Sequence, residues 1–254
     1  MKVIMNKKRN EKKLQVRIRE LITLNFVTYI KKIMNFPKTT ALLLMLFMCL
    51  NLKADTKTIF VDAFNTLEID GYFDVTLVQS KSNSVTIEAS DKLISFVQIA
   101  ESSTHLSINF NKKPGPYRHI HIIVAFTQLK EIESKIHGTL RTKGVLNLES
   151  LFLDIVSYRP SILELNVRKI DIDATGHGDI QLKGHATKGN INASMHGKLD
   201  ASKFIVDYLN INASGSGDIN VNAKIEASAN NTGKGKLKFN GEAQSIDYCP
   251  VEFG

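Results

Sequence analysis

The chain is poor in the residues and patterns that mark a wide aromatic core or a helical fold. It holds no tryptophan among 254 residues, and aromatic residues make up 7% of the sequence, which suits a narrow core. Helical periodicity is almost absent after residue 55. The stretch DKLISFVQI at 91–99 is the one candidate for a short helix. A predominantly helical fold is therefore excluded.

Cysteine is also scarce, with two residues in the whole chain. Cleavage after Ala54 would leave only Cys249 in the mature protein, which excludes an intramolecular disulfide. The mature chain is long enough to bury a core without one. We expect Cys249 to be buried, and pairing with another molecule is the alternative.

A basic excess is missing from everything beyond residue 54. Residues 1–54 hold 12 of the 33 Lys and Arg residues and 2 of the 25 Asp and Glu residues, so the remaining 200 residues carry 21 basic and 23 acidic side chains, a net charge of −2. A nucleic-acid-binding body needs a basic face of its own. Nucleic acid is therefore excluded as a partner.

Residues 1–54 are expected to be a leader that consists of an upstream extension and a secretory signal. After Met34 come Lys38, an apolar run over 41–50 and a small residue, Ala54, which is the order of a cleavable signal. The apolar run is shorter than the roughly 20 residues of a membrane-spanning helix. The sequence therefore predicts export to the periplasm, the outer membrane or the cell surface.

Two features of the leader leave alternatives open. Residues 1–33 are unusual before a signal, so either Met34 is the true start or this segment is a basic amphipathic extension on a membrane surface. Cys49 in LFMC offers a lipidation site, although the large Met48 before it fits that poorly. Membrane contact is expected only through the leader, if it is uncleaved or lipidated.

Alternating apolar and polar residues fill the chain after residue 55. This period-two pattern is typical of strands with one face in a core and one in solvent. It occurs in YFDVTLVQ, NSVTIEAS, THLSINF, HIHIIVAF, SILELNV, KIDIDA, DIQLKG, NINAS, DINVNA, KIEASA and GKLKFNG. The sequence therefore predicts an all-β fold.

A repeat of about 20 residues organises the C-terminal half. One anchor position recurs with an apolar residue two positions later, and INAS stands twice, at 191–194 and 211–214. The anchors are Gly138, Pro160, Gly178, Gly197, Gly217 and Gly235, and the apolar residues are Leu140, Ile162, Ile180, Leu199, Ile219 and Leu237. We expect structural glycine turns at Gly138, Gly176, Gly178, Gly197, Gly215, Gly217, Gly233 and Gly235.

This repeat predicts a right-handed parallel β-helix, or β-solenoid, in which each coil holds two short strands and two turns. The expected buried columns are Ile180, Leu199, Ile219 and Leu237, then Ile172, Ile191, Ile211 and Ile225, and then Ala174, Ala193, Ala213 and Ala227. Residues 55–130 lack the glycine frame and are expected to form an irregular N-terminal β cap, continuous with the solenoid at 131–254. A β-sandwich of regular hairpins is the rival fold.

The glycine turns do not predict a cofactor site. A glycine loop binds phosphate when a helix N-terminus follows it, whereas here each loop is followed by a strand. We therefore expect no cofactor. The histidines His177 and His196, on adjacent coils, and His119 and His121, on one strand, are weak metal candidates, because no third ligand stands at a fixed spacing from either pair.

The residues that follow the anchors predict a column of alternating charge. Asp179, Lys198, Asp218 and Lys236 would lie on successive coils, where opposite charges favour strand pairing. The two aspartates would then both stay ionised, whereas a glycosidase needs one protonated carboxyl group. The sequence therefore predicts no catalytic residue.

The segment FNTLEIDGYFDVTLVQSKSNSVTIEAS and the GHGDI and GSGDI turns resemble the putative auto-transporter adhesin head GIN domain family. The resemblance covers residues 60–247. It implies a secreted or envelope-attached protein of Bacteroidetes-like bacteria, with a pectin-lyase-like β-helix that lacks the pectin lyase catalytic residues. Pro160, Ile136 and Met195 depart from the glycine pattern of the turns.

The sequence thus predicts an exported, non-enzymatic β-solenoid for adhesion or envelope interaction. Surface glycans or other envelope proteins are the expected partners, and an oligomer is an option. A carbohydrate-active enzyme of pectin-lyase-like shape is one alternative. A self-associating envelope scaffold is another.

Overall fold

Strands make up most of the part of the chain that the computed structural model describes, which is residues 55–110, 120–243 and 245–250. The N-terminal strands are β1 (Asp55–Phe60), β2 (Thr66–Gly71), β3 (Asp74–Gln79), β4 (Ser84–Ala89), β5 (Gln98–Ser102), β6 (His105–Phe110), β7 (His121–Phe126), β8 (Glu131–Ile136) and β9 (Leu140–Thr142). The C-terminal strands are β10 (Leu146–Ser157), β11 (Ser161–Gly176), β12 (Ile180–Met195), β13 (Leu199–Gly215), β14 (Ile219–Asn231), β15 (Leu237–Asn240) and β16 (Ser245–Pro250). A short helix, α3 (Asp91–Ile94), falls in the predicted stretch 91–99. The all-β prediction is confirmed.

The predicted leader over 1–54 lies outside the described residues. The same is true of residues 111–119, which include the metal candidate His119. Within the described part of the chain, no helix is long and apolar enough to cross a membrane.

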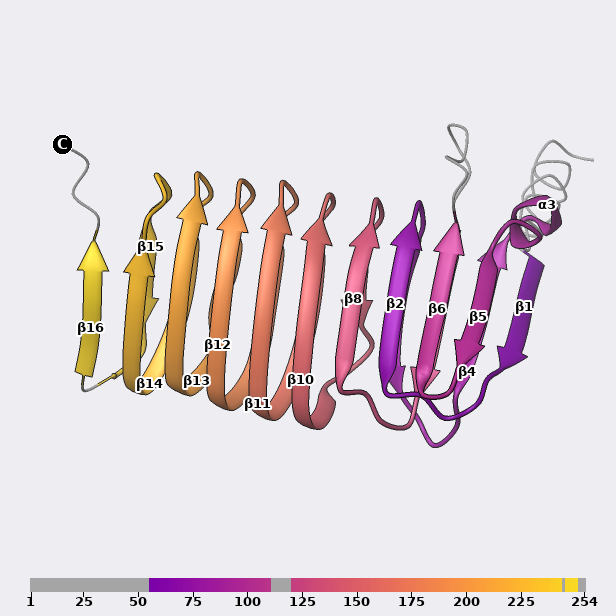
Figure 1. Ribbon diagram of the computed structural model, residues 1–254, viewed down its shortest axis with the longest axis horizontal. Helices are drawn as coiled ribbons and strands as arrows, with labels where there is room; N and C mark the ends of the chain where they lie inside the picture. Colours follow the sequence, from indigo (N-terminus) through magenta and orange to yellow (C-terminus); the bar gives the residue numbers. More distant parts are fainter. Residues whose placement is uncertain (1–54, 111–119, 244, 251–254) are drawn as a thin grey trace, which may run out of the picture. The chain divides into compact units, whose positions relative to one another are not determined.

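The C-terminal half is a β-solenoid. Strands β10 to β14 lie side by side in Figure 1, and each pairs in parallel with the next. Partner residues are 19 apart between β11 and β12, as for Ile172 and Ile191, and 20 apart between β12 and β13, as for Ile191 and Ile211. The predicted solenoid with coils of about 20 residues is therefore confirmed.

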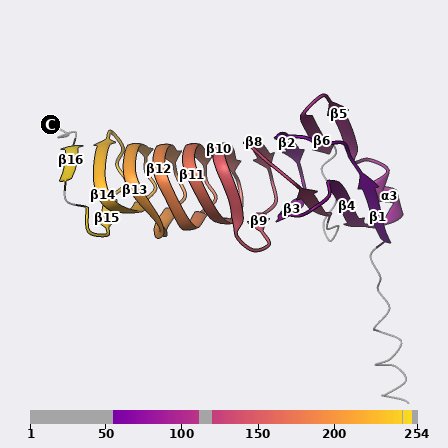
Figure 2. The ribbon, with the colours of Figure 1, turned by 90° about the horizontal axis from the view of Figure 1, so that it is seen from below.

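The coils of β11, β12 and β13 each have one glycine turn rather than the two turns that the sequence predicted. Strands β11, β12 and β13 contain 16, 16 and 17 residues, and each pairs along nearly its whole length with its neighbours. The strand therefore curves from one side of the tube to the other without breaking, as Figure 2 shows. In β12 this bend contains Gly184, whose φ of +112° an L side chain rarely adopts.

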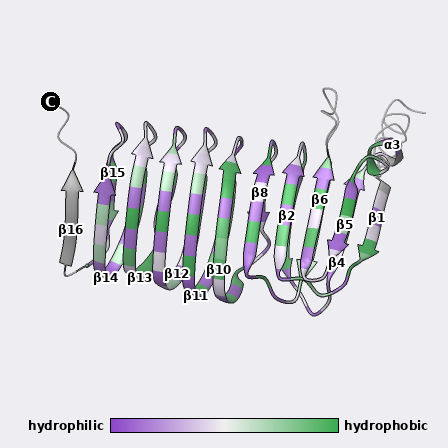
Figure 3. Ribbon diagram, viewed as in Figure 1, coloured by the Kyte–Doolittle hydropathy of each residue, from purple (hydrophilic) through white to green (hydrophobic). Residues whose placement is uncertain are grey.

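Alternation along the strands puts apolar side chains inside the tube and polar ones outside, which appears in Figure 3 as alternating bands. The predicted column of Ile180, Leu199, Ile219 and Leu237 is confirmed by the strand registers. The other two predicted columns are right as far as β13 and wrong at β14. Ala229 occupies the place predicted for Ile225, and Asn231 the place predicted for Ala227.

The error at β14 has a local cause. The pairing of β13 with β14 shifts register twice, between Asp200 and Ile205 and between Val206 and Tyr208, so β14 completes its path with fewer residues. IEAS in β14 resembles the INAS of the coils before it but lies elsewhere in the coil. Ile225 is consequently 39% exposed.

The anchor predicted at Pro160 is one residue too late. Ser161, which is buried, pairs with Leu140 and Ile180 in the place predicted for Ile162. Arg159 therefore holds the anchor position. Four other anchors donate their backbone N–H to the preceding coil, as Gly217 does to the Met195 carbonyl oxygen at 2.9 Å. Proline has no N–H to donate, so Pro160 could not make this bond.

The N-terminal part continues both sides of the tube with shorter strands. Strands β2, β6 and β8 pair in parallel on one side, and β3, β7 and β9 on the other. At the far end β1 and β4, β4 and β7, and β5 and β6 pair antiparallel. These are the irregular coils that the sequence predicted as a cap, and they share one buried core with the solenoid.

Candidate functional site

The glycine turns at one edge of the solenoid use their two glycines in different ways. The first glycine supplies a backbone conformation, since φ is +116° at Gly176 and +90° at Gly215, and a Cβ there would also lie within 2.2 Å of a carbonyl oxygen of the preceding coil. The anchor supplies space, since a Cβ on Gly217 would lie 2.0 Å from the Gly197 carbonyl oxygen. The sequence argument attributed positive φ to the turns in general, whereas the anchor is required by the close approach of neighbouring coils.

Residues other than glycine at the first position are accommodated inside the tube. Met195 pairs with Gly176 and with Gly215, and its side chain is fully buried. Ile136 is buried next to Gly71 in the same way. These departures from the family pattern therefore alter the packing beneath the turn and keep the turn itself in place.

A row of aromatic and imidazole rings runs along the turns. His137 stacks on Tyr72 with ring centroids 4.2 Å apart and on Tyr158 with centroids 4.1 Å apart. Further along, the rings of His177 and His196 are 4.7 Å apart and tilted by 37°. Tyr158 is in this row because the anchor of its coil is Arg159, so the misplaced anchor at Pro160 concealed it.

The histidine candidates differ in their surroundings. His177 and His196 are exposed neighbours, as the sequence predicted from their adjacent coils. Both ring nitrogens of His121 are occupied, Nε2 by the Thr76 hydroxyl at 2.8 Å and Nδ1 by the Glu88 carboxylate at 2.9 Å. Among the described residues, no group of three or more His, Cys, Asp or Glu side chains is arranged to hold a metal ion.

The predicted charge column bonds to the backbone. Asp179 accepts a hydrogen bond from the Lys198 N–H at 2.8 Å, and Asp218 accepts one from the Lys236 N–H at 3.0 Å. The Lys198 ammonium group pairs with Asp200 at 3.0 Å. Within the described part of the chain, no ion pair joins the four predicted residues to one another. The aspartates therefore satisfy turn N–H groups of the next coil.

The outward side of β11–β14, over the C-terminal part of each strand, carries three columns of polar side chains, which we call the polar face. The first column is Asp171, Asn190, Asn210 and Ser228, the second is Asp173, Asn192, Asn212 and Asn230, and the third is Thr175, Ser194, Ser214 and Thr232. Parallel pairing places successive members of a column about 4.8 Å apart. The face therefore repeats the same chemistry at a fixed interval along the solenoid.

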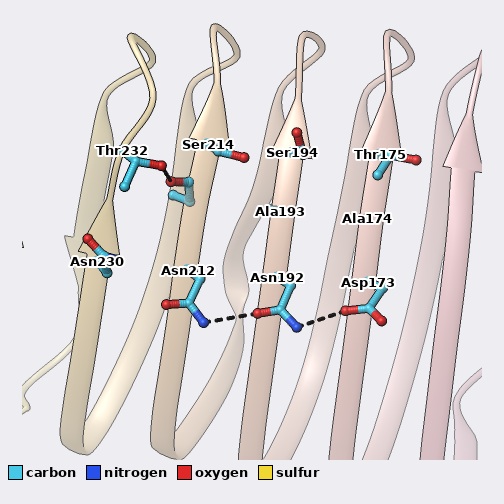
Figure 4. A pocket seen from close by; sticks show the side chains of 11 residues that line it. Asp173, Ala174, Thr175, Asn192, Ala193, Ser194, Asn212, Ser214, Asn230 and Thr232 are labelled. Atoms are coloured by element: carbon cyan, nitrogen blue, oxygen red, sulfur yellow. Dashed lines mark hydrogen bonds between the residues drawn. The ribbon is translucent and has the colours of Figure 1, made fainter.

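Hydrogen bonds between coils fix the amides of the polar face. The Asn212 amide donates to Asn192 Oδ1 at 3.0 Å, and the Asn192 amide donates to Asp173 Oδ1 at 2.8 Å, as the dashed lines in Figure 4 show. In the first column the Asn190 amide donates to Asp171 Oδ1 at 2.6 Å. An amide has two N–H donors, so Asn192 and Asn212 each keep one for a ligand.

Two shallow grooves lie on this face. One, of about 330 Å³, includes Asn192, Ser194, Asn212 and Thr232 in its lining and is the pocket of Figure 4. The other, of about 510 Å³, is lined by Lys169, Lys188, Asn190, Tyr208, Leu209, Asn210, Glu226 and Ser228. Tyr208 is 43% exposed and stands two residues before Asn210, so its ring is on the same side of β13.

Acidic side chains continue the second column beyond Asp173. Asp154 pairs with Asp173 on one side and Glu133 on the other, and Glu133 pairs with Glu68. Partial burial, and then the charge of Asp173, raise the pKa of Asp154 above its usual range. Asp171 lies one column away. Its partial burial opposes ionisation, but hydrogen bonds from Lys169 and Asn190 outweigh this and lower its pKa.

Sequence reasoning missed the polar face, Tyr208 and the acidic column. The signal was present in the INAS repeats, whose isoleucine and alanine predicted the core. Their asparagine and serine lie on the opposite side of the same strands. Asp154 and Asp173 could not be placed together, because the predicted frame was displaced by one residue at the turn that joins their strands.

The family model described as "Putative auto-transporter adhesin, head GIN domain" matches residues 63–243. No curated protein sequence matches the chain.

Solved structures share the fold at low identity. A putative adhesin from Bacteroides fragilis has a TM-score of 0.73 and 20% identity, over 77% of this chain and 92% of that one. A putative adhesin from Parabacteroides distasonis has a TM-score of 0.61 and 21% identity, over 79% and 94%. A putative lipid binding protein from the same species has a TM-score of 0.56 and 15% identity, over 80% and 98%. The match over residues 63–243 confirms the resemblance in the sequence, and the chain belongs to the putative auto-transporter adhesin, head GIN domain family.

Proposed function

We propose that this protein is an exported, non-enzymatic adhesin that acts through a binding surface on its solenoid. The observation that carries this proposal is the polar face, a regular array of exposed amides and hydroxyls held in place by bonds between coils. Membership of an adhesin-named family supports the same role. Surface glycans are the partner that this chemistry suits best, and other envelope proteins are the alternative.

Two measurements test this function. In the native bacterium, cell fractionation followed by protease treatment of intact cells should place the protein at the cell surface. The purified chain should attach to cells or glycan-coated surfaces and release no new reducing ends from polysaccharides. A cytoplasmic location, or turnover that one point substitution abolishes, would overturn the proposal.

A second candidate function is a carbohydrate-active enzyme of pectin-lyase-like shape. One observation favours it, because Asp154 has a raised pKa and lies beside Asp173, as a general acid lies beside a second carboxylate. Both side chains lie on the outside of the sheet and are partly exposed to water. If this function holds, Asp154→Asn should abolish the release of reducing ends. If the adhesin proposal holds, wild type and variant both release none.

A further inference from the structure

We infer that the polar face and Tyr208 form a binding site for a neutral, linear polysaccharide that lies along the solenoid axis. This inference rests on the proposed function and identifies the surface and the class of ligand. It is carried by three observations, which are the repeated spacing of the face, its fixed amides and its small net charge.

The spacing of the face matches a ligand that is itself a repeat. Asparagine stands at the same place in three successive coils, as Asn192, Asn212 and Asn230, and serine or threonine at another, as Ser194, Ser214 and Thr232. Neighbouring positions are about 4.8 Å apart along the axis. A polymer of identical units can present the same hydroxyl groups to each coil in turn, whereas a folded protein surface other than that of a second solenoid has no such period.

The amides are already in place for binding. Asn212, Asn192 and Asp173 form one directional chain of hydrogen bonds, which limits the rotation of each side chain. Binding therefore loses little side-chain entropy. The remaining N–H of each amide and the nearby hydroxyls supply the mixture of donors and acceptors that sugar hydroxyls require.

Tyr208 adds an apolar platform beside these polar groups. Its ring is 43% exposed and lines the same groove as Asn190 and Asn210. An aromatic side chain whose polar end is exposed to solvent is well suited to an interface that is partly apolar. The apolar C–H side of a sugar ring can lie on Tyr208 while its hydroxyls reach the two amides.

The charge of the face favours a neutral chain over an acidic one. Ten of the twelve members of the polar face are uncharged, and the other two are Asp171 and Asp173. In the groove beside Tyr208, the charge of Lys169 is partly neutralised by its pair with Asp171 at 2.9 Å, and Lys188 and Glu226 carry opposite charges. The carboxylates Glu133 and Asp154 extend the same sheet beyond Asp173. A polyanion would meet these negative charges at one end of the site.

Affinity gel electrophoresis of the full-length chain tests the inference directly. The gels contain β-1,4-glucan, β-1,3-glucan or mannan as neutral probes, or polygalacturonate as the acidic probe. At least one neutral polysaccharide should retard the wild-type protein. The double variant Asn192→Ala/Asn212→Ala, and separately Tyr208→Ala, should each weaken this affinity about tenfold, equivalent to one or two lost hydrogen bonds or a lost ring contact.

The matched control is Asn166→Ala. Asn166 is an exposed asparagine that also donates to the preceding coil, to Asn147 Oδ1 at 3.0 Å, but it lies away from the polar face. It should bind like wild type. Thermal unfolding of every variant confirms folding, and each substituted residue is exposed, so none removes core contacts.

Each other outcome overturns a different statement. The site is contradicted if the Asn192→Ala/Asn212→Ala and Tyr208→Ala variants bind with the affinity of wild type, or if Asn166→Ala loses as much affinity as they do. Retardation by polygalacturonate alone contradicts the neutral class. Dimerisation that the face variants abolish, with no retardation by any polysaccharide, makes the face an interface between two copies.

If the chain attaches to cells but to no polysaccharide, the ligand class is wrong and the adhesin function stands. If it attaches to neither, both fail.

Discussion

At the scale of single residues, the solenoid depends on close backbone approach between neighbouring coils. A Cβ at Gly178, Gly197, Gly217 or Gly235 would lie 2.0 to 2.5 Å from a backbone oxygen of the preceding coil. Backbone atoms cannot give way as a flexible side chain can. The anchor glycines therefore set how tightly the coils stack.

Replacing Gly217 with alanine should destabilise the protein by about 3 kcal/mol, because the new methyl group overlaps the Gly197 carbonyl oxygen. Gly144→Ala is the control. It has a φ of +81° but no atom within 4 Å of the added Cβ, so it should lose about 1 kcal/mol from backbone strain alone. Urea unfolding measures both. A loss at Gly217 no larger than that at Gly144 would contradict the packing argument.

The pKa of Asp154 predicts a pH-dependent gain from its removal. Burial and Asp173 raise this pKa in the folded state, so ionised Asp154 destabilises the fold at pH 7. The penalty disappears as the pH falls through the raised pKa and below the unfolded value near 3.8. Asp154→Asn should therefore raise the melting temperature at pH 7 and have little effect near pH 3.

Asp171→Asn is the matched control with the opposite sign. The pKa of Asp171 is lowered in the folded state, so its charge stabilises the fold above pH 3.8 and this contribution is lost as the pH falls through the lowered value. The substitution should lower the melting temperature at pH 7. Effects of the same sign in both variants would refute the assignment of these two environments.

At the scale of one coil, the turns hold the register through rings and carboxylates. Tyr158 lies in the ring row next to His137, whereas Arg159 takes the anchor place. Tyr158→Ala should therefore cost about 1 kcal/mol from the lost ring contact. Arg159→Ala, one residue further on, should cost less than half of that in the same urea unfolding experiment. A larger loss of stability in Arg159→Ala than in Tyr158→Ala would instead support the frame in which Pro160 is the anchor.

Lys198 tests the charges of the turn edge. Lys198→Glu would remove the pair with Asp200 and place a carboxylate between Asp179 and Asp218, so it should destabilise the protein by about 1 kcal/mol. Lys198→Gln should have a smaller effect. Because salt screens exposed charges, the loss in Lys198→Glu should shrink in 1 M NaCl. A melting temperature of Lys198→Glu that is unchanged or higher would contradict the placement of Lys198 between Asp179 and Asp218.

The sequence was informative about the inside of the coil and less so about its outside. Inward positions hold a narrow set of residues, so the Ile180, Leu199, Ile219 and Leu237 column could be found from spacing alone. The bulges in β13 leave no mark in the apolar pattern, and for that reason Ile225 and Ala227 were misplaced. The role of outward residues such as Asn192 and Tyr208 depends on their neighbours on other coils. These neighbours can be identified only when the register between the coils is known.

At the scale of the whole molecule, stacking turns a short repeat into an extended surface. No single coil holds a complete site, because each contributes one member to each column of the polar face. A cap of antiparallel strands covers the N-terminal end, and the repeated coils carry the amides and hydroxyls. Binding strength should therefore depend on how many coils a ligand spans.

The most direct test of this account is the affinity of the full-length chain for oligosaccharides of increasing length, prepared from the neutral polysaccharide that it retains and measured by isothermal titration calorimetry. The account predicts that affinity rises with each added sugar until the chain spans β11–β14, about 14 Å along the axis, and is then constant. A monosaccharide that binds as tightly as the longest chain would contradict it.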